Sequence, residues 1–334
     1  MNLIEALQKF IVWLRISKNA SPRTLEQYVF HIWKLIQYLN IELTKNIDYK
    51  FLFLQSPTAP DLIRLKKRYA DDLISWFDWK IEELDMDILN NFRFSLSETD
   101  LSIKTVNAYM ITLRTFFKYL RKQWLKCLDP VMIDLIKQEE RKVAFLDKDE
   151  VSRLLAQIDL ETIQWIRDLA IMECIYSTGL RISELVALNR IDVNLATQEF
   201  AVRWKWWKVR VVYLTDEARD RIWDYISRRD DHFPPLFIRH NYDKGNEMAL
   251  SSEKVRLSRF FITNMIKEYA LKAWILKDIS AHTLRHSFAT TLLENWADLR
   301  SIQELLWHKN ITTTQVYTHV TNPKLKEIHK KFHK

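Results

Sequence analysis

Apolar residues recur at helical spacing through most of the first 130 residues, which restricts this part of the chain to amphipathic helices. The spacing is clear from Leu3 to Leu14 and again from Leu25 to Ile36. Ser21-Pro22 precedes the second stretch, with an N-cap residue followed by a proline at the first helical position. A further helix is predicted from about Ser102 to Lys122. These helices are expected to form one hydrophobic core.

The length of 334 residues favours two domains, each large enough to bury its own core. Between them, the charged segment from Asp129 to Lys148 is expected to be an extended linker. We therefore predict a mainly α-helical protein with a helical domain in residues 1–135, a linker in 136–146 and a second domain in 147–334. The second domain should be rich in helices and carry a small antiparallel β-sheet.

Several elements of the second domain can be placed from local signals. Asp147 with Glu150 forms a capping box for a helix through Leu155, and a longer helix follows from Thr162 to about Ser177. Gly179 stands where the end of that helix needs a left-handed residue. Two short segments are rich in residues that favour β-strands, Phe200–Arg203 and Val209–Leu214. They predict a hairpin or a three-stranded sheet, and helices are expected again after Thr215.

The formal charge of +8 and the isoelectric point of about 9.2 favour an anionic partner. No apolar run reaches membrane-spanning length and no secretory signal is evident, so we expect a cytoplasmic protein that does not use a membrane. Cys127 and Cys174 are far apart and lack metal-ligand spacing, which favours two buried thiols over a disulfide or zinc site.

Basic and polar residues on the helix from Ser102 are candidate contacts to DNA phosphates. Such residues more commonly form a helix face that is exposed to water. Two residues near the second predicted strand join these candidates. The full set is Lys104, Thr105, Asn107, Arg114, Lys118, Arg121, Lys208 and Arg210.

Four short stretches of the second half hold residues suited to phosphoryl transfer. They are Thr178–Leu185 with Arg181, the segment around Lys205, the sequence HTLRH from His282 to His286, and His308 followed nine residues later by Tyr317. Each is weak alone, because such residues usually have surface or packing roles. Together they fit a phosphodiester site, in which two arginines hold the equatorial oxygens and a positioned side chain attacks.

The chemistry assigns tasks to these residue types. A tyrosine hydroxyl has a pKa near 10, so Tyr317 needs a proton acceptor and a cationic field, which His282 and the arginines can supply. His282 and Arg285 are three residues apart and should share one helix face. Lys205 is a candidate general acid for the leaving 5′-hydroxyl. No acidic cluster with metal-binding spacing is present, which disfavours a metal-dependent nuclease.

The order of these motifs resembles the tyrosine recombinase/integrase family, and most closely its bacterial Xer-type members. The resemblance rests on TGLRISEL, a hairpin lysine, HTLRHSFAT, a histidine in the form Leu-x-His and ITTTQVYTHV. It extends to the N-terminal half through SPRTLEQY and SIKTVNAYMITLRTFFKYL. The resemblance implies that residues 1–135 are a core-binding domain that clamps DNA and that residues 147–334 are the catalytic domain.

The resemblance also implies a role for each site residue. Arg181 and Arg285 would bind the scissile phosphate together with His308, and His282 would be the general base. Lys205 would be the general acid, and Tyr317 would form a 3′-phosphotyrosine. No metal or nucleotide cofactor is implied.

The implied assembly is a homo-tetramer on two sites in duplex DNA, with a second recombinase or a DNA translocase as further partners in some members. The segment after Pro323 resembles a tail that docks on a neighbouring protomer, with a lysine-rich surface tail as the equal alternative. The implied activity is Xer-like resolution of chromosome or plasmid dimers, or integration and excision of a mobile element. Two other functions remain open at this point, a type IB topoisomerase and a DNA-binding architectural or regulatory module with impaired catalysis.

Tryptophan occupies positions where this family usually has glycine. The chain has 2 glycines and 13 tryptophans, although glycine usually makes up about 7% of a protein. The family's glycine positions correspond to Trp204, Trp206, Trp296 and Trp307, and often lie near Trp124, Trp207 and Trp274. Three explanations stay open: a damaged enzyme, a member rich in tryptophan, or a gene from a genome that reads UGA as glycine, here translated with tryptophan.

Overall fold

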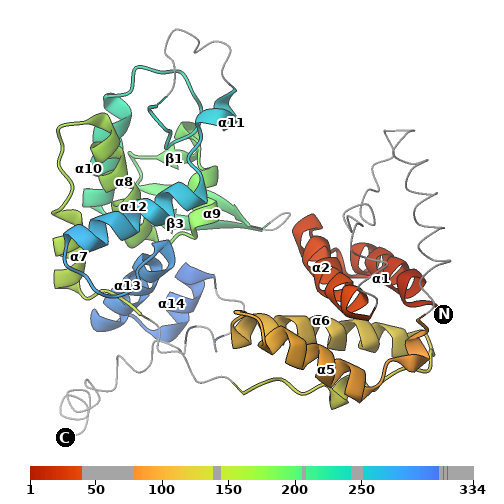
Figure 1. The fold of residues 1–334 in the computed structure, drawn as a ribbon. Coiled ribbons are helices and arrows are strands. Elements are labelled where there is room, and N and C mark those ends of the chain that lie inside the picture. The colour runs from red at the N-terminus through yellow and green to blue at the C-terminus, as the bar shows by residue number, and fades with distance from the viewer. Residues whose placement is uncertain are drawn as a thin grey trace, which may run out of the picture. The chain divides into compact units, whose positions relative to one another are not determined.

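The computed structural model describes residues 1–39, 79–137, 144–204, 208–241, 251–307, 311 and 314. The chain separates into two compact units, Met1–Glu140 and Arg141–Lys334 (Figure 1). Each unit buries its own cluster of hydrophobic side chains. The fold is mainly helical with a small antiparallel sheet, as predicted.

The described part of the first unit is built from amphipathic helices. The predicted starts are confirmed, because Asn2 and Ser102 accept hydrogen bonds from the first helical turns that follow them. Aromatic rings fill much of the core, where Phe10 lies edge-on to Phe116 with ring centroids 5.2 Å apart. The helices are α1 (Leu3–Lys18), α2 (Pro22–Leu39), α5 (Met86–Ser97) and α6 (Ile103–Lys122), with short 3₁₀ helices η2 (Ile81–Glu83) and η3 (Pro130–Met132).

The segment after α6 is not an extended linker over its whole length. Ile133 is buried in the core of the first unit. The Asn107 amide donates to the Ile136 carbonyl at 2.8 Å and accepts from the Ile136 N–H at 2.9 Å. The stretch from Asp129 to Ile136 is therefore part of the first unit, so the expectation of an extended segment from Asp129 is wrong, although the predicted bounds of 1–135 and 136–146 already assigned most of it to the first domain. Apolar residues within the charged sequence were the signal for this packing.

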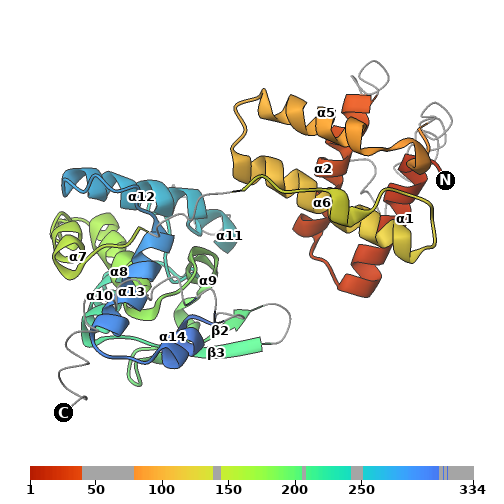
Figure 2. The same ribbon diagram turned by 90° about the horizontal axis from the view of Figure 1, so that it is seen from below.

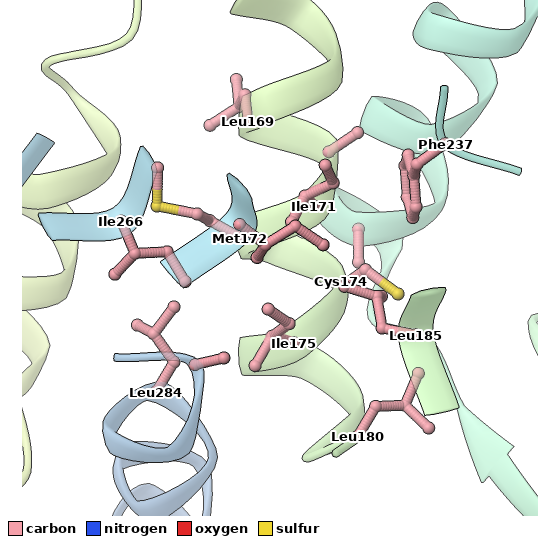
Figure 3. Close-up of a cluster of buried hydrophobic side chains, with 14 of the residues drawn as sticks. Leu169, Ile171, Met172, Cys174, Ile175, Leu180, Leu185, Phe237, Ile266 and Leu284 are labelled. Carbon is pink, nitrogen blue, oxygen red and sulfur yellow. The ribbon is translucent and has the colours of Figure 1, made fainter. Parts of the chain in front are cut away.

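The second unit surrounds α8 (Ile163–Thr178), which packs against α10 (Asp216–Ser227) and α13 (Ala281–Glu294). Figure 3 shows apolar side chains of α8 pointing toward Ile266 and Leu284. Cys174 is fully buried among these residues, and burial raises the pKa of its thiol to about 12. The other helices are α7 (Lys148–Leu155), α9 (Ile182–Ala187), α11 (Ser252–Val255), α12 (Arg259–Lys272), α14 (Leu299–Leu306) and the 3₁₀ helix η4 (Arg190–Asp192).

The predicted sheet is confirmed as three antiparallel strands in the order β1-β2-β3. Val202 of β2 pairs with Arg210 of β3, and Phe200 pairs with Val212. Figure 2 shows the β2–β3 hairpin at one side of the unit, next to α9 and α14. The strands are β1 (Val193–Asn194), β2 (Glu199–Trp204) and β3 (Lys208–Tyr213).

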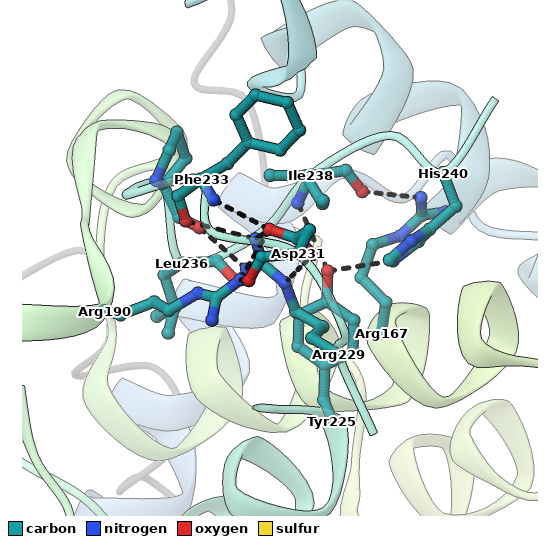
Figure 4. Close-up of polar contacts among 10 residues, drawn as sticks. Arg167, Arg190, Tyr225, Arg229, Asp231, Phe233, Leu236, Ile238 and His240 are labelled. Carbon is teal, nitrogen blue, oxygen red and sulfur yellow. Dashed lines mark hydrogen bonds and ion pairs between the residues drawn. The ribbon is translucent and has the colours of Figure 1, made fainter. Parts of the chain in front are cut away.

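A buried polar network supports the loop that follows α10 (Figure 4). Arg229 donates to both carboxylate oxygens of Asp231, at 2.8 and 2.6 Å, and Arg190 donates to one of them at 2.6 Å. The Tyr225 hydroxyl lies 3.0 Å from Nε2 of His240. Burial, reinforced by the nearby guanidinium groups, lowers the pKa of His240 to about 4, so its imidazole is neutral near pH 7. The network fixes backbone that pairs with the segment after α9, as in the contact from the Leu236 N–H to the Leu188 carbonyl at 2.9 Å.

Four tryptophans have left-handed backbone conformations. Trp124, Trp274, Trp296 and Trp307 have φ values of 59°, 56°, 69° and 51°. Each follows the C-terminus of a helix, where glycine is the usual residue because it has no Cβ to clash with the backbone. Only two other non-glycine residues in the described ranges have positive φ, Asn19 and Gln198. The backbone at these four tryptophans is therefore of the kind that favours glycine.

Candidate active site

The turn from α8 into α9 places Arg181. Gly179 has a φ of 61° and ends α8, as predicted. A Cβ at this position would lie 2.5 Å from a ring carbon of Phe288, so a larger residue does not fit without movement. Arg181 is the N-cap residue of α9, and its own N–H donates to Oε2 of Glu184 at 2.9 Å. Its guanidinium donates to Oε1 of Glu184 at 3.0 Å, with the side chain 31% exposed.

The first turns of α13 carry His282 and Arg285, which share a helix as predicted. Arg285 is only 1% exposed. Its Nη1 donates to the carbonyl of Gly179, and its Nη2 donates to the carbonyl of Leu306 at 2.5 Å. A guanidinium can hold two such carbonyls because its donors lie in one rigid plane. Arg285 therefore connects the turn before Arg181 to the end of α14.

The C-terminal end of α14 accepts hydrogen bonds from three arginines. Leu305, Leu306 and Trp307 supply consecutive carbonyls. Their donors are Arg210 at 3.3 Å, Arg285 at 2.5 Å and Arg181 at 3.5 Å, respectively. Carbonyls in the last turn of a helix lack partners within that helix, and the helix dipole favours cations there. The end of α14 is thus the common anchor of the two predicted phosphate-binding arginines.

Glu184 is a site residue that the sequence analysis missed. Its side chain is 5% exposed and pairs with both Arg181 and Arg210, the latter at 2.6 Å. Its position three residues after Arg181 in a short helix was the available signal, because a glutamate there reaches back to the N-cap residue.

His282 has the electrostatics of a proton acceptor. His282 is exposed, but the protein around its imidazole displaces part of the surrounding water, and this desolvation lowers its pKa below 6.5. The positive charges of Arg285 and Arg181 lower the pKa further. Both arginines are thus close enough to His282 to affect its charge. The imidazole is mainly neutral at pH 7, which is the form that a general base needs.

We expect the His282 pKa to rise when Arg181 is replaced by glutamine, because one source of positive charge is removed. In the unmodified protein the imidazole should titrate below pH 6.5, measured by NMR of the ring protons with His282→Gln used for assignment. Arg228→Gln is the matched control, since Arg228 pairs with Asp224 on a separate helix of the same unit. A His282 pKa at or above 6.5 in the unmodified protein would contradict this electrostatic account.

Three predicted catalytic residues lie outside the described residues: Lys205, His308 and Tyr317. Lys208 is the first residue of β3, and the structure describes its backbone but not its side chain. The structure therefore brings together Arg181, His282 and Arg285. His308 follows directly on Trp307, the residue that ends α14.

The candidate DNA contacts on α6 and β3 differ in their exposure to solvent. Lys104, Lys118 and Arg121 are exposed, and Thr105 and Arg114 are half-buried. Arg114, Lys118 and Arg121 line a surface pocket of about 740 Å³ in the first unit. Asn107 is 5% exposed and is occupied by its contacts to Ile136, while Arg210 in the second unit is 3% exposed and is paired with Glu184. Burial of Asn107 and Arg210 argues against the direct DNA contacts predicted for them.

Within the described ranges, no group of three or more histidine, cysteine, aspartate or glutamate residues is arranged to hold a metal ion. No helix in the same ranges is long and apolar enough to cross a membrane.

The chain is similar in sequence to known recombinases. Residues 144–323 match the phage integrase family. Tyrosine recombinase XerD of Oceanobacillus iheyensis is 33% identical over 329 residues, which cover 98% of this chain and 98% of that protein. Tyrosine recombinase XerD of Listeria monocytogenes is 36% identical over 290 residues, which cover 85% of this chain and 96% of that protein.

The fold is similar to that of solved recombinase structures. The XerH site-specific recombinase in a post-cleavage complex with its difH substrate gives a TM-score of 0.65 at 18% identity, covering 99% of this chain and 96% of that chain. A lambda integrase dimer bound to a core site gives a TM-score of 0.63 at 13% identity, and the match covers 95% of this chain and 77% of that chain. Taken with the sequence matches, these findings show that the chain belongs to the phage integrase family and, within it, to the Xer-type tyrosine recombinases.

Proposed function

We propose that this protein cuts and rejoins duplex DNA at a specific site through a 3′-phosphotyrosine intermediate formed by Tyr317. The observation that carries the proposal is the convergence of Arg181, at the start of α9, with His282 and Arg285, in the first turns of α13. Two guanidinium groups can stabilise the charge of the transferring phosphoryl group, and a neutral imidazole beside them can accept the tyrosine proton.

Each remaining residue has a proposed part in the same reaction. Lys205 protonates the leaving 5′-hydroxyl, and His308 donates a hydrogen bond to the scissile phosphate. The phosphotyrosine retains the energy of the broken bond, so rejoining requires neither a metal ion nor a nucleotide cofactor. This chemistry matches the donor set of the described site, in which the arginines supply the positive charge.

The proposed domain roles are DNA clamping by residues 1–135 and catalysis by residues 147–334. The first role is supported by the exposed lysines of α6, Lys104 and Lys118; Arg121 is also exposed but pairs with Asp129. Phosphate contacts of this kind position a protein on DNA without reading its sequence.

The proposed assembly is four protomers on two DNA sites in the cytoplasm. The biological outcome is resolution of chromosome or plasmid dimers, supported by relatives named XerD that match most of the chain. A second recombinase or a DNA translocase is a further proposed partner. The same relatives favour a recombinase over a type IB topoisomerase or a DNA-binding module without catalysis.

The test uses a DNA substrate with a nick beside a candidate Xer-type site, so that the cleaved strand cannot be rejoined. We expect a covalent protein–DNA complex that survives denaturation, and peptide mapping should place the DNA on Tyr317. The complex should be absent with Tyr317→Phe, which removes the hydroxyl but keeps the ring. DNA linked to another residue, or tight binding to a verified target without any covalent complex, would overturn the proposal.

A further inference from the structure

Glu184 divides its carboxylate between two arginines. Oε1 accepts from Nη1 of Arg181 at 3.0 Å, and Oε2 accepts from Nη2 of Arg210 at 2.6 Å. The contact to Arg210 is the shorter one and lies deeper, since the side chains of Arg210 and Glu184 are 1% and 5% exposed, while that of Arg181 is 31% exposed. One negative charge therefore lies between two positive charges, and this group of three keeps a net positive charge.

Arg210 is placed so that it cannot itself touch DNA directly. Its other contact is the Leu305 carbonyl at 3.3 Å, and its Nε is buried without a hydrogen-bond partner within the described part of the protein. Burial lowers the pKa of its guanidinium, the Glu184 charge raises it, and the Arg181 charge lowers it. Burying a permanent charge with an unsatisfied donor is costly, and an apolar residue would fill the same place at lower cost. The cost points to a role beyond packing of the sheet.

We propose that Arg210 is a positioning residue that holds Glu184 and so leaves the charge of Arg181 available to the scissile phosphate. This proposal rests on the proposed function, since it concerns the same site. Without Arg210, Oε2 of Glu184 keeps only the N–H of Arg181 as a partner, at 2.9 Å, so it can turn from that N–H until both oxygens accept from the Arg181 guanidinium. Such a bidentate pair is the strongest geometry for these groups. Such a pair neutralises Arg181 and turns its donors away from the DNA.

The same residue also fixes the end of α14. The Leu305 carbonyl that Arg210 holds is one residue before the carbonyl held by Arg285 and two before that held by Arg181. Arg210 therefore positions Arg181 by two routes, through Glu184 and through α14. Only the first depends on the charge of Glu184, and this difference separates a positioning role from a purely structural one.

The experiment compares Arg210→Met with the double variant Arg210→Met/Glu184→Gln. We expect Arg210→Met to slow covalent complex formation at saturating DNA by about 100-fold, because a misplaced catalytic group typically costs this much. DNA affinity should be unchanged, since it depends on many phosphate contacts. The double variant should recover about tenfold of the lost rate, because a neutral glutamine cannot neutralise Arg181. A structural role predicts instead that the double variant is as slow as Arg210→Met or slower.

Arg228→Met is the matched control, because it breaks an exposed arginine–aspartate pair on α10 in the same unit. It should leave the rate unchanged. Arg210→Lys should keep most of the rate, since an ammonium group can still pair with Glu184. Thermal unfolding shows whether each variant is folded. If Arg210→Met is unfolded, Arg210→Gln replaces it as the neutral variant. In that case the rate of Arg210→Lys is expected to exceed the rate of Arg210→Gln. Equal rates for arginine, lysine and the neutral variant would overturn the proposal.

A second readout does not depend on catalysis. NMR of isotope-labelled arginine, assigned with Arg181→Gln, reports rotation of the Arg181 guanidinium about its Nε–Cζ bond. We expect this rotation to slow in Arg210→Met, as a bidentate pair with Glu184 forms, and to return to the unmodified rate in the double variant. If the unmodified protein forms no covalent complex but this change is seen, the proposed function fails while the role of Arg210 stands. Unchanged rotation in Arg210→Met would refute that role.

Discussion

Substituting lysine for Arg285 is expected to slow formation of the covalent DNA complex by about 10³-fold at saturating DNA. The variant keeps the charge but loses the planar fork. Arg285 donates to the carbonyls of Gly179 and Leu306, which lie in different segments, and a guanidinium has further donors in the same plane for a phosphate. An ammonium group has three donors around one nitrogen and cannot bridge the two carbonyls and bind a phosphate at once.

The measurement is the single-turnover rate on the nicked substrate, with DNA affinity determined separately. Arg285→Lys should bind DNA normally, because one phosphate contact among many is affected. Arg228→Lys is the control, since it makes the same change in an exposed pair of the second unit. A loss of stability is also expected, because two buried carbonyls lose their donor, so circular dichroism at the assay temperature must show a folded protein. A rate within tenfold of the unmodified protein would mean that Arg285 does not bind the phosphate in the way proposed.

Replacing Trp274, Trp296 and Trp307 by glycine is expected to raise the free energy of unfolding of the second unit by about 3 kcal/mol, roughly 1 kcal/mol for each position. Each has a left-handed backbone, which costs energy for any residue with a Cβ. The indoles of Trp274 and Trp296 contribute little burial in return, since these residues are 84% and 51% exposed, whereas Trp307 is half-buried. Trp124→Gly, at a position that is 96% exposed, should stabilise the first unit by about 1 kcal/mol.

Denaturant titration with probes in each unit checks this prediction. The matched control is Trp223→Gly, because Trp223 is 62% exposed but lies within α10. That change should destabilise the second unit by about 1 kcal/mol, since glycine weakens a helix interior. A loss of stability on glycine substitution at 274, 296 and 307 would show that the tryptophans are accommodated without strain. Intact mass and peptide sequencing of the protein from its native source test the related hypothesis about UGA; tryptophan found at these positions would rule it out.

Most of the architecture was predictable because its signals are local. Capping residues and proline placed the starts of α2 and α7, apolar spacing placed α6, and the β-rich pieces placed the hairpin. The segment from Asp129 to Ile136 was misjudged because its charge outweighed a few apolar residues. Whether Ile133 packs depends on the hydrophobic core that only the folded first unit provides.

The candidate site was predictable as a set of residue types, but not as a set of contacts. Arg181 and Arg285 were found from the motifs that they belong to, and both meet at α14. Arg210 was predicted to touch DNA as one of two basic residues near the second predicted strand. Its burial against Glu184 depends on pairing between β2 and β3 and on the approach of α14, neither of which can be read from the residues around it. Positive charge in the sequence thus drew attention to Arg210, and its burial argues against the direct DNA contact predicted for it.

Three arginines donate hydrogen bonds to consecutive carbonyls at the end of α14, so the site is sensitive to a movement of this one helix. Because the three carbonyls belong to the last residues of α14 and the residue after it, a displacement of this helix is expected to lengthen the contacts of Arg181, Arg210 and Arg285 together. The chain continues from this helix directly into His308 and on to Tyr317. Catalytic competence is therefore expected to switch on and off as a whole, instead of fading one contact at a time.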